Sequence, residues 1–558
     1  MTGGWRLRGA LPRSAWTPLA FIVAALISLP VLVVTANLFT PASAIWQHLA
    51  ATVLSSYIAN SVWIMLGVGV GVLVIGVNTA WLVAMCEFPG RRIFEWALLL
   101  PFAVPAYVVA YTYTGLLDVS GPVQQWLREG LGMANVASWF PDIRSLVGAI
   151  VLMALVLYPY VYMLARTAFH EQSFAAIEVS RTLGCGPWRS FGTVSLPLAR
   201  PAVAGGLALA LMEALNDFGT VQFFGVDTFT TGIYRTWLGL GERPAAAQLA
   251  AVLMLFIFAL IVLERWSRGA RRYQHTGTRY QVLPRYRLRA MKAVVASIIC
   301  ATPVMLGFLV PALALTIWTI DTAAETIDHR FFTMAANSFL VAAITAMLAV
   351  ALAATLAYGL RIRRTGAMTV ATRVAGLGYA IPGSVIAVGV LIPFAFIDNA
   401  VDGWFRARFG ISTGLVLSGT LVALVFAYLV RFLAISLNTV EAGFGRITPR
   451  MDDAARSLGL SRGGVLGRVL APLMRGSLLT AGLLVFVDVM KELPATLLVR
   501  PFNFDTLATH TYEYASDEQL VEASSAALAI VVVGVVPVIL LSRAIARSRA
   551  GQDGGSLP

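Results

Sequence analysis

One pattern occurs twice in this chain, once in each half, in polar stretches between apolar segments. In each copy an acidic residue precedes a glycine by six positions, and a proline follows the glycine by 13. The first copy comprises Glu178, Arg181, Leu183, Gly184, Pro197, Leu198 and Arg200, and the second Asp453, Arg456, Leu458, Gly459, Pro472, Leu473 and Arg475. Seven positions that recur without a relative insertion indicate duplication of a whole unit. We therefore expect two similar halves in tandem.

Other landmarks repeat with nearly the same offset. Three pairs share one spacing: Asn60-Ser61 with Asn337-Ser338, Pro105 with Pro382, and Ala80 with Ala357. A strongly basic polar stretch separates the two sets, and it predicts a linker over 265–292. The predicted halves are 1–264 and 293–558, with the polar motifs in loops 170–200 and 445–475.

The composition is that of a membrane protein. Of the 558 residues, 58% are hydrophobic and only 12% are charged, against about 25% charged in soluble domains. Twelve apolar runs are long enough to cross a bilayer, which takes about 20 helical residues. They are 16–37, 56–84, 94–117, 145–166, 201–222, 245–263, 293–318, 336–359, 371–396, 413–437, 477–499 and 522–542. We predict an all-α membrane protein with twelve transmembrane helices, six in each half.

The distribution of charge predicts the orientation in the membrane. The first run follows three arginines but is too long for a signal peptide and lacks a clear cleavage site, so we expect it to be retained as a span. The formal net charge is +13, and the arginines concentrate in alternate loops, including both motif loops. The positive-inside rule then places both termini and both motifs in the cytoplasm. This pattern argues against a nucleic-acid partner, which would need a basic face on a folded domain.

Six spans in each half return the chain to the side on which it started. The halves would then have parallel topology and be related by an axis along the membrane normal. This arrangement argues against the secondary transporters that are built from inverted repeats.

Each motif predicts two short helices joined by a tight turn. In the first copy Gly184 suits the left-handed position that ends a helix, and Pro187 suits the first position of the next helix. In the second copy Gly459 ends the first helix and Ser461 can cap the next one.

The duplicated motif resembles the cytoplasmic Glu-Ala-Ala loop of the permease subunits of ABC importers that work with a periplasmic binding protein. The resemblance covers essentially the whole chain, and the stretches 216–237 and 488–518 are most similar to ferric iron importer permeases. In that family the loop docks on an ATP-binding subunit and transmits its closure to the spans. The resemblance implies coupling roles for eight residues: Glu178, Arg181, Gly184, Pro197, Asp453, Arg456, Gly459 and Pro472. It also implies two ATP-binding subunits and a binding protein as partners.

The first copy departs from the family pattern at the two positions after its acid. It reads Glu178-Val179-Ser180 where two alanines are usual, whereas the second copy reads Asp453-Ala454-Ala455. We therefore expect a weaker ATPase contact in the first copy.

Five charged residues stand within the predicted fifth and eleventh spans. They are Glu213, Asp217, Asp488, Lys491 and Glu492, and the acids at 213 and 217 correspond to those at 488 and 492. Charges are costly in lipid, so these groups should face the interior or pair, as Asp488 and Lys491 could on one helix. They follow the motif prolines by about five helical turns, toward the predicted periplasmic half. Two interpretations stay open: the acids line the translocation path and attract a cation, or they tie helices together at a gate.

The remaining patterns exclude several functions. The histidines at 48, 170, 275, 329 and 510 and the three cysteines are scattered without ligand spacing, so no metal site and no cofactor is predicted. A phosphate-binding Gly-x-x-x-x-Gly-Lys loop needs a lysine, and neither Lys292 nor Lys491 is so preceded. We therefore expect no enzymatic activity in this chain.

The sequence thus predicts an inner-membrane permease that imports ferric iron with energy from separate ATP-binding subunits. Thiamine, phosphonate or another small solute remains an alternative substrate. An alternative of another class is a secondary transporter driven by an ion gradient through the charges in spans five and eleven.

Overall fold

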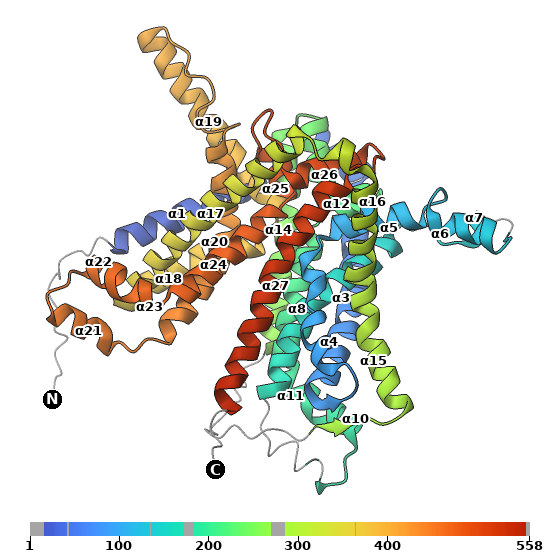
Figure 1. Ribbon diagram of the computed structural model, residues 1–558. Helices are drawn as coiled ribbons and strands as arrows, with labels where there is room; N and C mark the ends of the chain where they lie inside the picture. Colours follow the sequence, from blue (N-terminus) through green and yellow to red (C-terminus); the bar gives the residue numbers. More distant parts are fainter. Residues whose placement is uncertain are drawn as a thin grey trace. The chain divides into compact units, whose positions relative to one another are not determined.

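The computed structural model describes residues 16–41, 44–133, 136–171, 180, 182–268, 285–362 and 364–553. Within these ranges the chain is almost wholly helical, which confirms the predicted all-α class (Figure 1). The strands β1 (Cys86–Glu87) and β2 (Tyr286–Arg287) form a single short parallel pair.

The helices of the first half run in this order: α1 (Trp16–Ala36), η1 (Asn37–Phe39), α2 (Ala44–Thr52), α3 (Leu54–Met85), α4 (Arg91–Ala97), η2 (Leu100–Ala103), α5 (Ala106–Leu117), α6 (Pro122–Gln125), η3 (Trp126–Gly130), α7 (Val136–Trp139), α8 (Leu146–Glu171), α10 (Pro187–Ser190), η4 (Phe191–Ser195), α11 (Leu196–Asn216), α12 (Gly219–Phe223), α13 (Phe229–Tyr234), η5 (Arg235–Gly239) and α14 (Arg243–Arg268).

The helices of the second half are α15 (Met291–Val304), η6 (Met305–Leu309), α16 (Val310–Thr326), α17 (His329–Ile362), α18 (Gly366–Ala375), η7 (Gly378–Ala380), α19 (Gly383–Phe409), α20 (Leu421–Gly445), α21 (Arg450–Ser457), α22 (Arg462–Val465), η8 (Leu466–Leu470), α23 (Ala471–Leu473), α24 (Arg475–Met490), α25 (Pro494–Val499), α26 (Leu507–Ser516) and α27 (Ser524–Asp553).

The number of spans differs from the predicted twelve. In the described residues nine helices are long and apolar enough to cross a membrane, or eleven if each of two bent pairs counts as one span. The twelfth predicted run coincides with the apolar segment Ser524–Leu540 of α27, a helix that continues to Asp553. The two bent pairs account for two of the three spans by which the counts differ, and α27 accounts for the third.

The predicted third span is bent by 90° between Arg91–Ala103 and Ala106–Gly130. Pro105 stands at this break and is the N-cap residue of α5. In the second half Pro382 stands at the matching place, between η7 and α19. Because proline lacks an N–H and disfavours a helical residue before it, the duplicated prolines explain why both segments are interrupted.

Prolines also explain three widened turns. The segments η4, η6 and η8 are π-helical, and in each a proline follows the first residue by six positions, at 197, 311 and 472. A proline ring clashes with the carbonyl four residues earlier, and a π turn moves that carbonyl away. Because η4 and η8 occupy equivalent places in the two motifs, this irregularity is part of the duplicated unit.

The chain forms two compact units, and each contains segments of both halves. The smaller unit comprises the described residues up to Val33 together with 340–381 and 389–489, and the larger unit comprises 34–339, 382–388 and 490–558. In the larger unit α8 packs against α3 and α11, and α16 packs against α27. In the smaller unit α1 approaches α19 so closely that a Cβ at Gly389 would lie 2.5 Å from the backbone oxygen of Pro30.

The two halves use the same aromatic contact at the end of their second span. In the larger unit Trp81 of α3 packs edge to face on Phe169 of α8, with 5.5 Å between ring centroids. In the smaller unit Tyr358 of α17 stacks on Phe444 of α20 at 6.2 Å. Trp81 and Tyr358 are both fully buried. These two aromatic anchors lie next to the predicted coupling loops.

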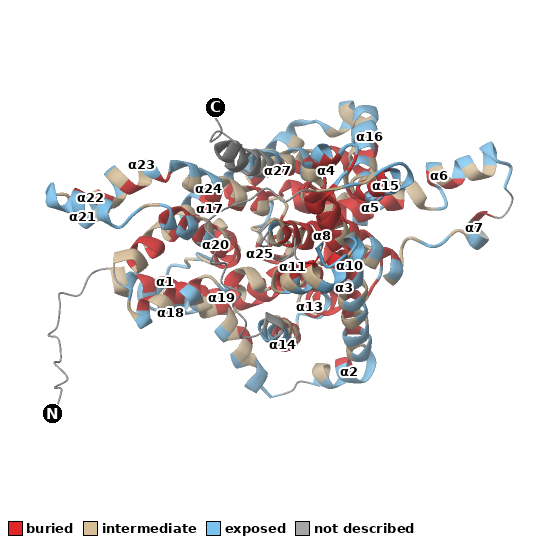
Figure 2. Ribbon diagram, turned by 90° about the horizontal axis from the view of Figure 1, so that it is seen from below, coloured by how far each residue is buried: buried red, intermediate tan, exposed pale blue. Residues whose placement is uncertain are grey.

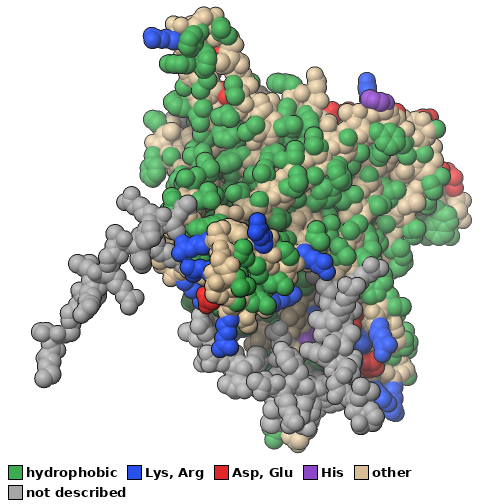
Figure 3. Space-filling model, turned by 60° about the vertical axis from the view of Figure 1, so that its left-hand side comes forward, with side chains coloured by type: hydrophobic (Ala, Val, Ile, Leu, Met, Phe, Trp, Pro, Cys, Tyr) green, Lys and Arg blue, Asp and Glu red, His purple; other side chains and the backbone are tan. Residues whose placement is uncertain are grey.

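Many large hydrophobic side chains are exposed along the spans, for example Val70 of α3 and Met347 of α17. On the face drawn in Figure 3 hydrophobic side chains cover a broad area, and lysines and arginines lie mostly at its edges. Exposed apolar surface of this extent suits helices that contact lipid.

Candidate functional site

The second motif forms the predicted helix, turn and helix. Helix α21 ends at Ser457, and Gly459 follows with a φ of 86° in the left-handed region, where glycine carries no steric penalty. Ser461 then caps α22 by accepting a hydrogen bond from the backbone N–H of Gly464 at 3.2 Å. Both predicted caps are confirmed.

The four predicted coupling residues of this copy, Asp453, Arg456, Gly459 and Pro472, are all exposed. Leu458, which directly precedes the glycine, is 85% exposed. Figure 2 shows α21 and α22 largely in the colour of exposed residues. The motif therefore presents a short helix, a tight turn and a solvent-exposed leucine at the surface of the smaller unit.

The first motif repeats this geometry where it is described. Gly184 has a φ of 76° and Pro187 begins α10, which confirms both predictions. Leu183, the counterpart of Leu458, is 77% exposed, and Pro197 is exposed at the start of α11. Glu178 and Arg181 lie outside the described residues.

The unusual Ser180 of the first motif is explained by its partner. Ser180 and Ser190 are both buried, and their hydroxyl oxygens lie 2.8 Å apart in a hydrogen bond. The corresponding residues of the second motif are Ala455 and Val465, which are also buried. A polar pair in one copy thus replaces an apolar pair in the other. The departure at position 180 lies inside the loop and not on its exposed surface.

Asp217 and Glu492 each cap the short helix that follows them. The Asp217 carboxylate accepts hydrogen bonds from the backbone N–H groups of Thr220 and Val221, at 2.9 and 3.2 Å, and from the Thr220 hydroxyl at 3.0 Å. In the second half, the Glu492 carboxylate accepts hydrogen bonds from the backbone N–H groups of Ala495 and Thr496, at 3.0 and 3.1 Å. It also accepts one from the Thr496 hydroxyl at 2.8 Å. Both acids satisfy N–H groups at a helix N-terminus, where negative charge is also favoured.

The prediction that all five charges lie within continuous spans is wrong. Glu213 and Asp488 are in α11 and α24, but Asp217 follows the last residue of α11, and Lys491 and Glu492 follow the last residue of α24. Lys491 thus lies directly after the helix that contains Asp488. The apolar runs continue through short helices beyond each break, and for this reason they read as single spans in the sequence.

The breaks after the two spans meet inside the larger unit. A Cβ at Gly219 of α12 would lie 2.6 Å from Cβ of Tyr107 and 3.0 Å from Cδ2 of Leu493. The Tyr107 hydroxyl donates to the carbonyl oxygen of Lys491 at 3.4 Å, and the Tyr234 hydroxyl donates to that of Pro494. The capped segments of both halves are therefore joined around Tyr107.

The landmark asparagines also belong to this region, although their role was not predicted. Asn60 donates to the carbonyl oxygen of Asp227 at 2.8 Å, and Asn337 donates to that of Asp505 at 3.1 Å. In each half the next residue, Thr228 or Thr506, caps a helix through a reciprocal pair of hydrogen bonds with a threonine three positions on. The recurrence of Asn-Ser at one offset was the signal in the sequence that could have identified this contact.

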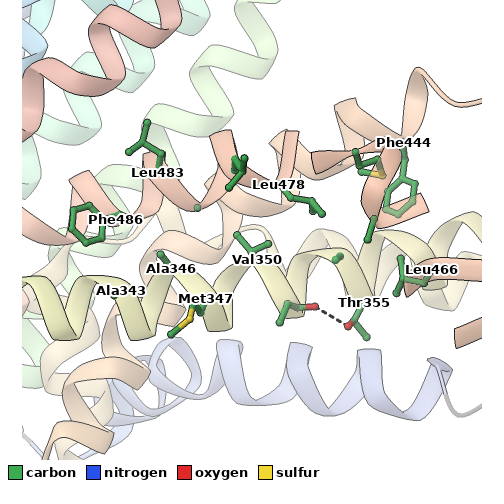
Figure 4. Close-up of a pocket in the computed structure, with 16 residues that line it drawn as sticks. Ala343, Ala346, Met347, Val350, Thr355, Phe444, Leu466, Leu478, Leu483 and Phe486 are labelled. Atoms are coloured by element: carbon green, nitrogen blue, oxygen red, sulfur yellow. Dashed lines mark hydrogen bonds between the residues drawn. The ribbon is translucent and has the colours of Figure 1, made fainter. Parts of the chain in front are cut away.

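The smaller unit also contains a groove of ≈ 880 Å³ between α17 and α24 (Figure 4). Its lining is apolar, with Met347, Val350, Leu478 and Phe486 among its side chains. The Thr355 hydroxyl on this wall donates to the carbonyl oxygen of Ala351 at 2.7 Å. This chemistry suits a hydrocarbon chain or a helix and is unsuited to a metal cation.

No group of three or more histidine, cysteine or carboxylate side chains that could hold a metal occurs in the described part of the chain. The described site residues thus include exposed turns that suit a docking partner, and two helix caps at the breaks after α11 and α24, of which Asp217 is half-buried and Glu492 is buried.

Comparison with known proteins identifies the class of chain. The family model for the binding-protein-dependent transport system inner membrane component matches residues 73–269. An Fe(3+)-transport system permease protein of Haemophilus influenzae is 26% identical over 497 residues, which is 88% of this chain and 90% of that protein. A molybdenum transport system permease protein of Escherichia coli is 28% identical over 34% of this chain and 83% of its own length. A sulfate transport system permease protein of Escherichia coli is 30% identical over 36% of this chain and 72% of its own length.

Proposed function

The chain belongs to the family of binding-protein-dependent transport system inner membrane components, the permeases of ABC importers, and from this premise we propose that it carries ferric iron into the cytoplasm. It is a multi-pass inner-membrane protein. In this proposal a periplasmic binding protein delivers the iron, and two identical ATP-binding subunits hydrolyse ATP. Both termini and both motif loops lie in the cytoplasm. The permease itself has no catalytic residue.

The observation that carries the substrate proposal is the length of the match to the Fe(3+)-transport permease. That match extends over both halves, whereas the molybdenum and sulfate permeases each match about a third of this chain. The acids at 213, 217, 488 and 492 add negative charge near the breaks, which favours a cation over an oxyanion. Molybdate and sulfate are the competing substrates.

The coupling role is proposed for the two exposed motifs. Among the described residues of their loops, Leu183 and Leu458 are the most exposed apolar side chains, and each stands beside a glycine around which there is open space. An exposed leucine beside a tight turn suits insertion into a groove on a partner. Two such loops imply one ATP-binding subunit for each, and this need distinguishes the proposal from a secondary transporter.

The gate role is proposed for Asp217 and Glu492. Each carboxylate fixes the start of a short helix at a break, so each can hold its segment in one of two positions without binding the iron itself. Glu213, Asp488 and Lys491 then supply charge to the adjoining path.

The test is uptake of labelled ferric iron at limiting concentration, in cells that lack this chain and in the same cells with it restored. Labelled molybdate and sulfate are measured in parallel. We expect iron uptake to fall without the chain and to return with it, while uptake of the oxyanions stays constant. If the oxyanions respond and iron does not, the iron assignment is wrong and the chain is an oxyanion permease.

A further inference from the structure

A single arginine, Arg361, joins the second coupling loop to a membrane-spanning helix. Arg361 stands in the last turn of α17, and its side chain is 13% exposed. Its Nε and Nη2 donate to the two carboxylate oxygens of Asp452 at 2.7 and 3.1 Å. This paired geometry restricts the angle between the side chains far more than a single ion pair would. Asp452 belongs to the first turn of α21.

The same guanidinium also holds the end of the preceding helix. Its Nη1 donates to the carbonyl oxygens of Phe444 and Ile447, at 2.9 and 3.0 Å. Helix α20 ends at Gly445, so both carbonyls lie at or just beyond its C-terminus, where a cation is favoured. One side chain therefore links α17 to the end of α20 and to the start of α21.

A second contact from the same face of α17 fixes the other helix of the loop. Tyr358, three residues before Arg361, donates from its hydroxyl to the carbonyl oxygen of Arg462 in α22 at 2.9 Å. Residues three apart lie on one side of a helix. Helix α17 thus holds α21 through Arg361 and α22 through Tyr358.

Helix α17 is long and uninterrupted. Its 34 residues run from His329 to Ile362, which corresponds to about 50 Å at 1.5 Å per residue. Near the other end of α17, the Asn337 side chain donates a hydrogen bond to the carbonyl oxygen of Asp505 at 3.1 Å. The Ser338 hydroxyl accepts one from the backbone N–H of Leu507 at 2.8 Å. A displacement of α21 would therefore act directly on the end of α17.

The first half cannot form this link. The residue that corresponds to Arg361 is Ala84, and the residue that corresponds to Asp452 is Ile177. Neither side chain can take part in an ion pair. Two buried arginines of that region, Arg91 and Arg166, instead pair with Glu95, at 3.6 and 2.6 Å. The ion pair that holds the second coupling loop therefore has no counterpart in the sequence of the first half.

We propose that Arg361 is the positioning residue that transmits movement of the second coupling loop to α17. This inference rests on the proposed function, because it requires that the loop docks on an ATP-binding subunit. It makes the second loop the more tightly coupled of the two.

The test reconstitutes the full chain with its ATP-binding subunits and binding protein in proteoliposomes, and measures ferric iron taken up per ATP hydrolysed. Arg361→Lys keeps the positive charge but loses the two parallel hydrogen bonds to the carboxylate. Asp452→Asn keeps the shape of the side chain but removes its negative charge. We expect each to lower transport per ATP by about tenfold, the order of a typical coupling between sites. Retention of the ATP-binding subunits and basal ATP hydrolysis should stay unchanged. Arg364→Lys, at an exposed arginine of the same segment, is the matched control and should behave as wild type.

The outcomes separate this inference from the function on which it rests. If the wild-type chain retains no ATP-binding subunit, the proposed function is wrong. If wild type couples and both variants match it, only the role of Arg361 is wrong. A merely structural role would instead lower the amount of protein, subunit retention and transport together.

Discussion

At the scale of the residue, the most informative positions are the two motif glycines. Gly184 and Gly459 have φ values of 76° and 86°, and a Cβ at either would meet no atom within 4 Å. The glycines are therefore required by backbone conformation, and the space around them is open for a partner. Replacing glycine by another residue at a left-handed position destabilises the fold by about 1 kcal/mol, and asparagine is the replacement that destabilises it least.

This geometry predicts different results for two double variants. Gly184→Trp with Gly459→Trp should lower iron uptake by at least about tenfold, because each indole would occupy the space that a docking subunit needs. Gly184→Asn with Gly459→Asn should retain most uptake, because asparagine tolerates this conformation. Uptake and the amount of permease in the membrane are measured together. Normal uptake by the tryptophan variant would contradict docking at these turns.

At the scale of the element, the short helices α12 and α25 depend on the acids before them. Each carboxylate accepts two backbone N–H groups and a threonine hydroxyl. Loss of such a cap typically costs about 1 kcal/mol, and asparagine caps about as well as aspartate.

The cap and the charge can be separated by substitution. If capping is the function, Asp217→Asn and Glu492→Gln should retain most iron uptake, whereas Asp217→Ala and Glu492→Ala should reduce it severalfold. Uptake is measured at equal levels of permease. If the amide variants are as impaired as the alanine variants, the negative charge itself serves the passage of the cation.

At the scale of the whole molecule, a pair of surface charges joins the two halves within the larger unit. Arg144 precedes α8, and Glu518 follows α26. The guanidinium donates to both carboxylate oxygens of Glu518, at 2.7 and 2.6 Å. The hydrogen bonds from Arg144 hold the pKa of Glu518 below its ordinary value. Because Arg144 is 29% and Glu518 59% exposed, the pair contributes at most about 1 kcal/mol.

The lowered pKa predicts how stability depends on pH. The folded state favours the ionised carboxylate, so the contribution is complete above the unfolded pKa of about 4.3 and is lost as the pH falls through the folded pKa. Glu518→Gln should therefore be less stable than wild type near neutral pH, and the difference should vanish in acid. Thermal unfolding in detergent from about pH 7 to about pH 3 measures this. A constant difference would show that the pair does not titrate as expected.

The sequence by itself determined the helical class, the duplication and the turns of the two motifs. These features depend on local chemistry: apolar length, a glycine that must be left-handed, and a serine or proline at a helix start. The same reasoning found Asp217 and Glu492 as equivalent acids but placed them inside continuous spans. It also passed over Asp452, the neighbour of the motif acid, and Arg361.

Only the tertiary structure decided where the spans break, what the acids do and which side chains hold the second loop. The run 201–222 was predicted as one span, yet the helix ends at Asn216 and the Asp217 carboxylate caps a new one. Arg361 and Asp452 are far apart in the sequence, and no local pattern relates them. Contacts of this kind depend on how distant helices pack, and packing is a property of the folded chain that residue spacing does not specify.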